Sequence, residues 1–245
     1  IDIENKARVV KFAFPGREEG IEREKENLLK IEKLGDQFDF VQRLSKTKND
    51  KYIDIDDALV TDYMPGQPLM YLGEINRDYL TNGISDEYAL DFLACMKELV
   101  KLGLDISDIA GKVNSLYNAE ERKIYLIDFD GQYHSGAKSI PEELQDPSLA
   151  SIFALITRVL NFESPRFRDM IEKFVEIDPD FKNKSFEQLS RVLKKSVQTG
   201  IFTQEELDMA IKKLYNLDED KRTDLLEPSR LNREFITKLP LLSIQ

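Results

Sequence analysis

The sequence predicts an α+β fold in which a small, strand-rich part precedes a larger and mostly helical part. Runs of β-branched and aromatic residues concentrate in residues 1–64, with one helical pattern between them. After a Pro-Gly-Gln-Pro break at residues 65–68, apolar residues recur at helical spacing. We therefore expect an N-terminal part over 1–64, a helical part over 65–200 and a helical C-terminal extension over 201–245.

The composition limits the chemistry that this chain can perform. Its 245 residues are 41% hydrophobic, enough to bury the core of one large domain or two small lobes. The single Cys95 and single His134 exclude an intrachain disulfide and a Cys- or His-rich metal site, and they disfavour a Ser-His-Asp mechanism. No apolar run approaches the length of a membrane span, about 18–20 residues. We expect a soluble protein of a reducing, cytosolic environment.

The net charge further limits the partners and the kinds of site that are expected. Lys and Arg number 35 and Asp and Glu number 46, so the formal net charge is −11 and nucleic acid is not expected as the main partner. Carboxylate, lysine and asparagine side chains remain, and these residue types are typical of sites that bind a metal ion together with a nucleotide.

The N-terminal part is predicted to hold three strands and one helix. Residues 9–14 form a β-branched and aromatic run that ends at a Pro-Gly pair, and residues 38–44 and 52–63 are further strand candidates. Residues 18–34 have helical periodicity. Glu24 interrupts the apolar face of this helix, which otherwise consists of Ile21, Leu28 and Ile31.

The remaining elements are mostly helices. Residues 86–102 carry apolar side chains at helical spacing and end at Gly103, and Cys95 lies on this pattern as a core residue. A short strand pair is expected around a turn at 118–122. Further helices are expected at 148–162, 166–177, 185–199, 203–215 and 227–238.

The segment 123–131 carries the strongest chemical signal. An apolar strand ends there in Asp128-Phe129-Asp130-Gly131, and a carboxylate at a strand end can reach Mg²⁺. A plain β-turn explains the same residues, since Asp and Gly are common in turns. Upstream, Asp108 and Asn114 lie in a polar loop after a helix. Together these residues could present three oxygen ligands or bases at one place.

These residues resemble the catalytic motifs of the protein kinase family. Ile106-Ser107-Asp108 stands where the family has His-Arg-Asp or His-Gly-Asp, and Asn114 follows one residue later than the family spacing. Asp128-Phe129-Asp130 stands in place of Asp-Phe-Gly. Val9-Val10-Lys11 resembles the strand whose lysine binds the α- and β-phosphates of ATP. Glu24 stands where the family keeps the glutamate that pairs with this lysine, with Glu26 as the fallback.

Further landmarks extend the resemblance to about residues 5–200. Residues 59–66 resemble the hinge between kinase lobes, in which Thr61 would be the gatekeeper and the backbone of Asp62, Tyr63 and Met64 would bind adenine. Residues 151–155 resemble the start of the central helix, with Ser151 in place of Asp. Residues 176–189 resemble a late stretch of the family without its arginine.

The resemblance implies a two-lobed fold and an ATP- and Mg²⁺-dependent (or Mn²⁺-dependent) kinase, Ser/Thr-directed, with a protein substrate. Lys11, oriented by Glu24, would neutralise the phosphates. Asp128 and Asn114 would hold the metal ions. Asp108 would accept the proton of the substrate hydroxyl, and Asp105 is the less favoured alternative base.

Four departures from the family pattern shape the expectation. No glycine-rich loop precedes Lys11, and the chain starts at Ile1 rather than Met, so we interpret it as a processed or excised piece in which this loop is absent or truncated. The loop lacks a His or Arg before Asp108, and Asn114 is displaced by one residue. Ser151 follows Asp128 by only 23 positions, and the segment between them has no Ala-Pro-Glu motif. This abbreviated segment resembles the atypical kinases that pathogenic bacteria secrete into host cells, which implies an effector and virulence role on host proteins.

Three other readings remain open. The chain could be a pseudokinase scaffold, a kinase-fold transferase that moves AMP or phosphorylates a small molecule, or an α+β interaction domain. A basic patch could also bind a polyanionic activator, although solvated helix faces explain the same residues more simply. The patch would comprise Lys194, Lys195, Lys212, Lys213, Lys221 and Arg222.

Overall fold

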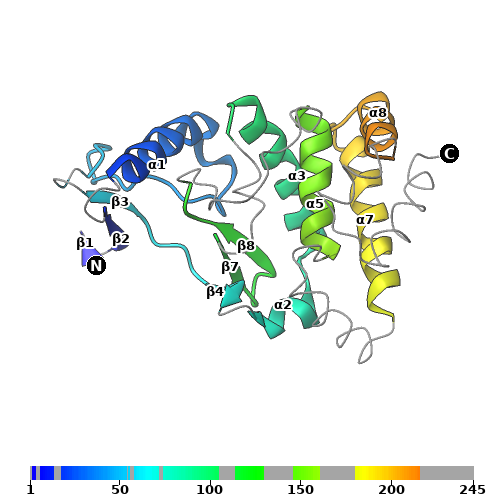
Figure 1. Cartoon of the computed structure of the whole chain (residues 1–245), viewed down its shortest axis with the longest axis horizontal. Helices are drawn as coiled ribbons and strands as arrows, with labels where there is room; N and C mark the ends of the chain where they lie inside the picture. Colours follow the sequence, from blue (N-terminus) through cyan, green and yellow to red (C-terminus); the bar gives the residue numbers. More distant parts are fainter. Residues whose placement is uncertain are drawn as a thin grey trace.

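The structure, a computed structural model, describes residues 2–3, 6–13, 18–53, 55, 58–71, 74–104, 114–129, 146–160 and 180–215. The α+β class is confirmed. Figure 1 shows the first strands and helix α1 at one side of the molecule and the packed helices α3, α5, α7 and α8 at the other, with strands β7 and β8 between them.

A three-stranded antiparallel sheet forms the N-terminal part, in the order β1-β2-β3. Its strands are β1 (Asp2–Ile3), β2 (Lys6–Phe12) and β3 (Ala58–Asp62). Lys11 pairs with Leu59 in the register. The predicted strand at 9–14 is therefore confirmed, although it begins earlier and ends at Phe12.

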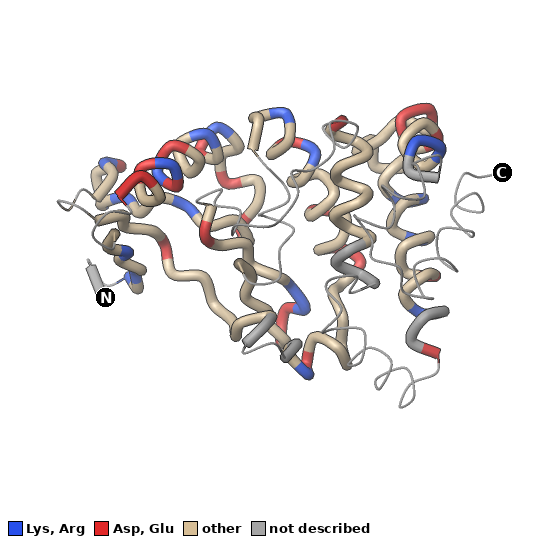
Figure 2. Tube along the Cα trace, in the orientation of Figure 1, with Lys and Arg blue, Asp and Glu red and all other residues tan. Residues whose placement is uncertain are grey.

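Helix α1 (Glu18–Ile31) follows the predicted periodicity and contacts β3. Its buried residues are Glu24, Leu28 and Ile31, so the glutamate lies on the face that packs inward. Acidic and basic side chains intermix along the rest of the helix (Figure 2). A 3₁₀ helix, η1 (Glu32–Gln37), continues from its end.

A second antiparallel sheet has the order β4-β7-β8. It contains β4 (Gln67–Pro68), β7 (Ser115–Asn118) and β8 (Lys123–Leu126). The turn predicted at 118–122 joins the last two strands. A separate pair, β5 (Met70–Tyr71) and β6 (Glu74–Ile75), precedes the helices.

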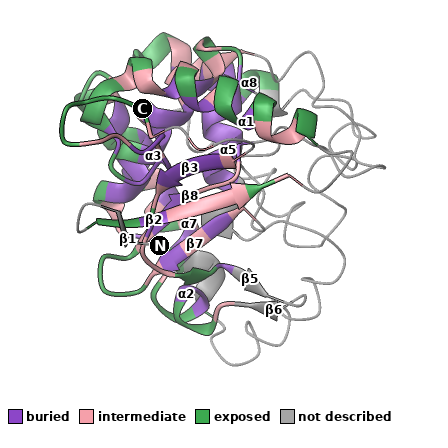
Figure 3. Ribbon diagram, turned by 90° about the vertical axis from the view of Figure 1, so that its left-hand side faces the viewer, coloured by how far each residue is buried: buried purple, intermediate pink, exposed green. Residues whose placement is uncertain are grey.

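The helical part is built around α3 (Asp86–Lys101), which begins at the N-cap Ser85 and follows the short α2 (Arg77–Asn82). Helix α3 packs against α5 (Pro147–Leu160) and α7 (Phe181–Gln198), and α5 also packs against α8 (Gln204–Tyr215). Figure 3 shows buried residues on the facing sides of these helices and in the central strands. Cys95 is buried in this core, as predicted, and burial raises the pKa of its thiol. None of the described helices is long and apolar enough to cross a membrane.

The strand predicted at 38–44 is wrong, because the segment divides its hydrogen bonds between two sheets. On one side Gln42 N donates to Leu126 O (3.0 Å), and Leu126 N donates to Phe40 O (2.8 Å). On the other side Arg43 O accepts a hydrogen bond from Asp62 N at 3.0 Å. Neither side forms a continuous ladder, and only isolated bridges result. Of the strand predicted at 52–63, the described residues form Ala58–Asp62.

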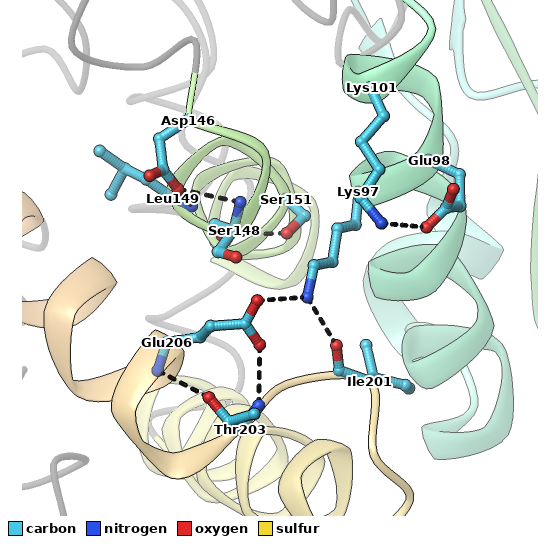
Figure 4. A network of polar contacts seen from close by, with 10 residues as sticks. All are labelled: Lys97, Glu98, Lys101, Asp146, Ser148, Leu149, Ser151, Ile201, Thr203 and Glu206. Carbon is cyan, nitrogen blue, oxygen red and sulfur yellow. Dashed lines mark hydrogen bonds and ion pairs between the residues drawn. The ribbon is translucent and has the colours of Figure 1, made fainter.

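Helix α8, the start of the predicted C-terminal extension, is fastened to α3 by one lysine (Figure 4). Lys97 Nζ donates to Ile201 O and to Glu206 Oε1, both at 2.9 Å, and lies 4.7 Å from the centre of the Phe202 ring. Thr203 and Glu206 form a capping box at the start of α8, because Glu206 N donates to Thr203 Oγ1 and Thr203 N donates to Glu206 Oε2. The beginning of the extension is therefore part of the helical core.

Candidate functional site

Lys11 lies between two carboxylates that come from distant parts of the sequence. Its Nζ is 2.5 Å from Glu24 Oε1 and 2.9 Å from Asp128 Oδ1. Strand β2 carries the lysine, the buried face of α1 carries Glu24, and Asp128 follows the end of β8. The structure thus brings together three of the residues predicted from the sequence. Glu26, the fallback partner, is exposed on α1.

The three charged groups of this cluster differ in burial and in the direction in which their surroundings shift the pKa of Lys11 and of Glu24. Burial alone would lower the pKa of Lys11, but Glu24 and Asp128 outweigh it, so the pKa of the ammonium is raised above 10.5. Burial raises the pKa of Glu24, whose side chain is 2% exposed, and this exceeds the opposing effects of Lys11 and of the Phe129 backbone N–H. Asp128 remains 43% exposed. Lys11 is therefore held as a cation between the buried carboxylate of Glu24 and the partly exposed carboxylate of Asp128.

The backbone around Asp128 is bent and tied down. Asp128 has φ of 63°, in the left-handed region that few residues except Gly, Asn and Asp adopt. The carbonyl oxygen of Asp128 accepts a hydrogen bond from Asn114 Nδ2 at 3.3 Å, and Asn114 O accepts one from Ile127 N at 3.1 Å. Asn27 Nδ2 donates to Phe129 O at 2.8 Å. The chain therefore leaves β8 in one fixed direction, which places the carboxylate beside Lys11.

Gln42 is a member of this cluster that sequence reasoning missed. Its amide oxygen accepts a hydrogen bond from Asp128 N at 3.2 Å, and its Nε2 donates to Thr61 Oγ1 at 3.0 Å. Gln42 and Thr61 are both buried. A polar residue inside the apolar run 38–44 was the available signal, because a buried amide needs partners.

The predicted gatekeeper lies on the same face of the sheet as the lysine. Thr61 pairs with Val9, and Lys11 pairs with Leu59, so all four side chains share one face by the two-residue period. Asp62, the next residue, accepts a hydrogen bond from Ser45 Oγ at 2.8 Å.

The other two predicted hinge residues differ in burial. Tyr63 is exposed, and Met64 is buried. Within the described ranges, no hydrogen bond engages the backbone of either residue.

The oxygen donors of the cluster fit a magnesium ion that is shared with phosphate. In the part of the chain that the structure describes, no group of three or more His, Cys, Asp or Glu side chains could hold a metal by itself. Mg²⁺ bound with nucleotide usually takes only one or two protein oxygens and completes its shell with phosphate and water. The Asp128 carboxylate and the neighbouring Asn114 amide supply this smaller set.

The predicted bases Asp105 and Asp108 lie outside the described residues, and so do Lys221 and Arg222 of the predicted basic patch. The single His134 and the helices expected at 166–177 and 227–238 also lie outside them. Among the predicted basic patch, Lys213 is engaged with Asp146 at 3.1 Å, and Lys194, Lys195 and Lys212 are exposed.

Neither models of known protein families nor curated proteins give a match to this chain. Its relation to the protein kinases therefore stays a prediction from the sequence motifs.

Proposed function

We propose that the chain has a two-lobed, protein-kinase-like fold and transfers the γ-phosphoryl group of ATP to a hydroxyl group in a Mg²⁺-dependent reaction. The observation that carries the proposal is the contact of Lys11 with both Glu24 and Asp128. These residues are separated by 13 and 117 positions in the sequence. If the kinase resemblance holds, Lys11 must pair with Glu24 and all three residues must lie close together. Motif matches that arose by chance would not bring these residues together.

Lys11 would bind the α- and β-phosphates. Its raised pKa keeps the ammonium charged, and Glu24 fixes its position through a charge-assisted hydrogen bond. Glu24 is buried and is also bonded to the Phe129 backbone. It therefore orients the lysine without competition from water for the hydrogen bond. This arrangement neutralises phosphate charge before reaction, which is the main contribution that a protein makes to phosphoryl transfer.

Asp128 and Asn114 would hold the metal ion. Bound Mg²⁺ neutralises charge on the phosphate oxygens and orients them. Asp128 suits this role because its carboxylate is partly exposed while its backbone is fixed by Gln42 and Asn114. Asn114 is next to Asp128, because its Nδ2 donates to the Asp128 main-chain carbonyl oxygen.

In the transfer step, the substrate hydroxyl oxygen forms a bond to the γ-phosphorus while the bond to the β-phosphate oxygen breaks, and ADP leaves. Asp108 would accept the hydroxyl proton, as the resemblance implies. The expected substrate is a Ser or Thr side chain of a protein, and the shortened segment after Asp128 supports the proposed role as a bacterial effector that acts on host proteins.

The test uses two substitutions at backbone positions with the same unusual geometry. Asp128→Asn removes the charge that would bind the metal. Asp50→Asn is its matched control, because Asp50 also has a positive φ (59°) but is exposed and lies far from Asp128 in the sequence. Asn tolerates this region, so neither change adds backbone strain. We expect Asp128→Asn to lose at least about a hundredfold of the phosphoryl transfer rate, since a metal-bound charge contributes several kcal/mol, and Asp50→Asn to keep it.

Mass spectrometry of the products separates the competing functions. Added phosphate on protein substrate or on the chain itself agrees with the proposal. Added AMP assigns the other transferase chemistry, and nucleotide binding without any product assigns a pseudokinase. Equal activity in Asp128→Asn and Asp50→Asn would remove Asp128 from the mechanism.

A further inference from the structure

A cleft of about 490 Å³ lies away from the Lys11 cluster and shares no lining residue with it. Three segments form its walls: residues 79–87 at the junction of α2 and α3, Arg122 in the turn between β7 and β8, and residues 184–191 of α7. Its volume is within the range of small-molecule sites, about 300–1,000 Å³. These walls come from sequence positions up to about a hundred residues apart, so folding alone creates the cleft.

A continuous chain of hydrogen bonds fixes the walls to one another. Ile84 O accepts from Arg122 Nη2 at 3.1 Å and from Gln188 Nε2 at 2.8 Å. Gln188 Nε2 also donates to Asp86 Oδ1 at 3.0 Å, and Asp86 Oδ2 accepts from Arg191 Nε at 3.2 Å. Arg122 is thus bonded to Ile84 and Arg191 to Asp86, and these two acceptor residues are only two positions apart in the chain.

Both guanidinium groups keep donors for a ligand. Each makes a single hydrogen bond within the described ranges, Arg122 through Nη2 and Arg191 through Nε, although a guanidinium has five N–H donors. Lys184 also lines the cleft, so three cations face two acids, Asp86 and Glu87, in a chain whose net charge is −11. One of these acids is already engaged by Arg191 and Gln188.

We propose that this cleft binds the phosphate group of a small phosphate ester. Guanidinium groups bind phosphate oxygens in pairs of parallel hydrogen bonds, with a geometry that a lysine ammonium cannot supply. Arg122 and Arg191 would each donate to the phosphate, while Gln188 stays bonded to Ile84 and Asp86. This site does not depend on the proposed kinase function, because no residue of the Lys11 cluster takes part.

The direct test is titration of the full chain with O-phosphoserine at low ionic strength, followed by calorimetry. Inorganic phosphate and serine are the comparison ligands, and they separate recognition of a bare phosphate from recognition of the ester. We expect binding of phosphoserine and none of serine. Arg122→Gln and Arg191→Gln should each weaken binding about tenfold, as expected for a lost hydrogen bond to a charged group.

Lys194→Gln is the matched control, since Lys194 is an exposed cation of α7 outside the cleft, and it should leave the affinity within about twofold. Glu87→Gln removes an exposed acid of the cleft and should tighten binding, an outcome that loss of folding cannot mimic. Undetectable binding, equal losses in Lys194→Gln and the two arginine variants, or abolition by Asp128→Asn in the Lys11 cluster would each overturn the proposal.

Discussion

The ion pair between Lys11 and Glu24 makes an asymmetric prediction for folding stability. Lys11→Met leaves Glu24 buried without its cation, whereas Glu24→Gln leaves Lys11 with Asp128. Removing one partner of a fully buried pair costs about 3–5 kcal/mol, and because the Lys11 side chain is 24% exposed we expect a smaller loss, about 2–3 kcal/mol, for Lys11→Met. Glu24→Gln should cost about 1 kcal/mol, since a neutral amide replaces a charge-assisted hydrogen bond.

The double variant isolates the contact. When Lys11→Met is combined with Glu24→Gln, the buried carboxylate is gone together with its cation, so no uncompensated buried charge remains. The loss of unfolding free energy should therefore fall below the sum of the two single losses by at least about 1 kcal/mol. Urea denaturation of the four proteins at pH 7 measures this difference. Additivity within about 0.5 kcal/mol would refute the reasoning.

The pH dependence of the Lys11→Met variant gives a second check. Without the lysine, burial holds the folded pKa of Glu24 above its unfolded value of 4.5. The folded state then binds a proton more readily than the unfolded state, so this contribution to stability is greatest at low pH and is lost as the pH rises through the folded pKa. The deficit of Lys11→Met relative to the unsubstituted chain should therefore shrink from pH 8 toward pH 5. A deficit that is the same at both pH values would contradict the burial of a lone carboxylate.

Three further predictions concern other contacts. Gln42→Leu leaves the Asp128 N–H unpaired, so it should lower kcat/KM for ATP by about tenfold or more, and an unchanged kcat/KM would show that the amide does not position Asp128. Lys97→Met should lower the unfolding free energy by about 1–3 kcal/mol, because the lysine makes two hydrogen bonds and a cation–π contact, while the exposed Lys101→Met should change it by less than about 1 kcal/mol, and equal losses would contradict this assignment. Burial alone would raise the pKa of Asp146, but the Leu149 N–H, Lys213 and the Ser148 N–H outweigh burial and hold this pKa below 3.8. The carboxylate therefore stabilises the fold above that pH, and the stabilisation is lost as the pH falls through the folded pKa. Asp146→Asn should make the unfolding free energy less dependent on pH in this acid range, and an unchanged pH dependence would refute this prediction.

The sequence predicted the elements whose local pattern agrees with their final packing. Helix α1 was found from its periodicity, and the one acidic residue on its apolar face is the buried partner of Lys11. The hairpin around 118–122 and helix α3 followed from turn residues and apolar spacing. Local pattern was sufficient there because each segment buries the face that its own period defines.

Elements that depend on tertiary partners were not predictable. Residues 38–44 carry an apolar run that is typical of a strand, yet they bond alternately to β8 and β3 and form no ladder. Gln42 acquires its role only because these two strands lie on either side of it. Lys97 likewise gained its role from Ile201 and Glu206, more than a hundred residues away, and no local spacing could indicate that contact.

The central claim is that Lys11 positions the phosphates of ATP for transfer, and the most direct measurement is incorporation of label from γ-labelled ATP with Mg²⁺. Lys11→Met should lose at least about a hundredfold of the rate, because it removes a charged hydrogen-bond donor to phosphate in the transition state. Lys6→Met is the control, an identical change at an exposed position of the same strand, and should keep the wild-type rate. Label transfer at the wild-type rate in Lys11→Met would contradict the account.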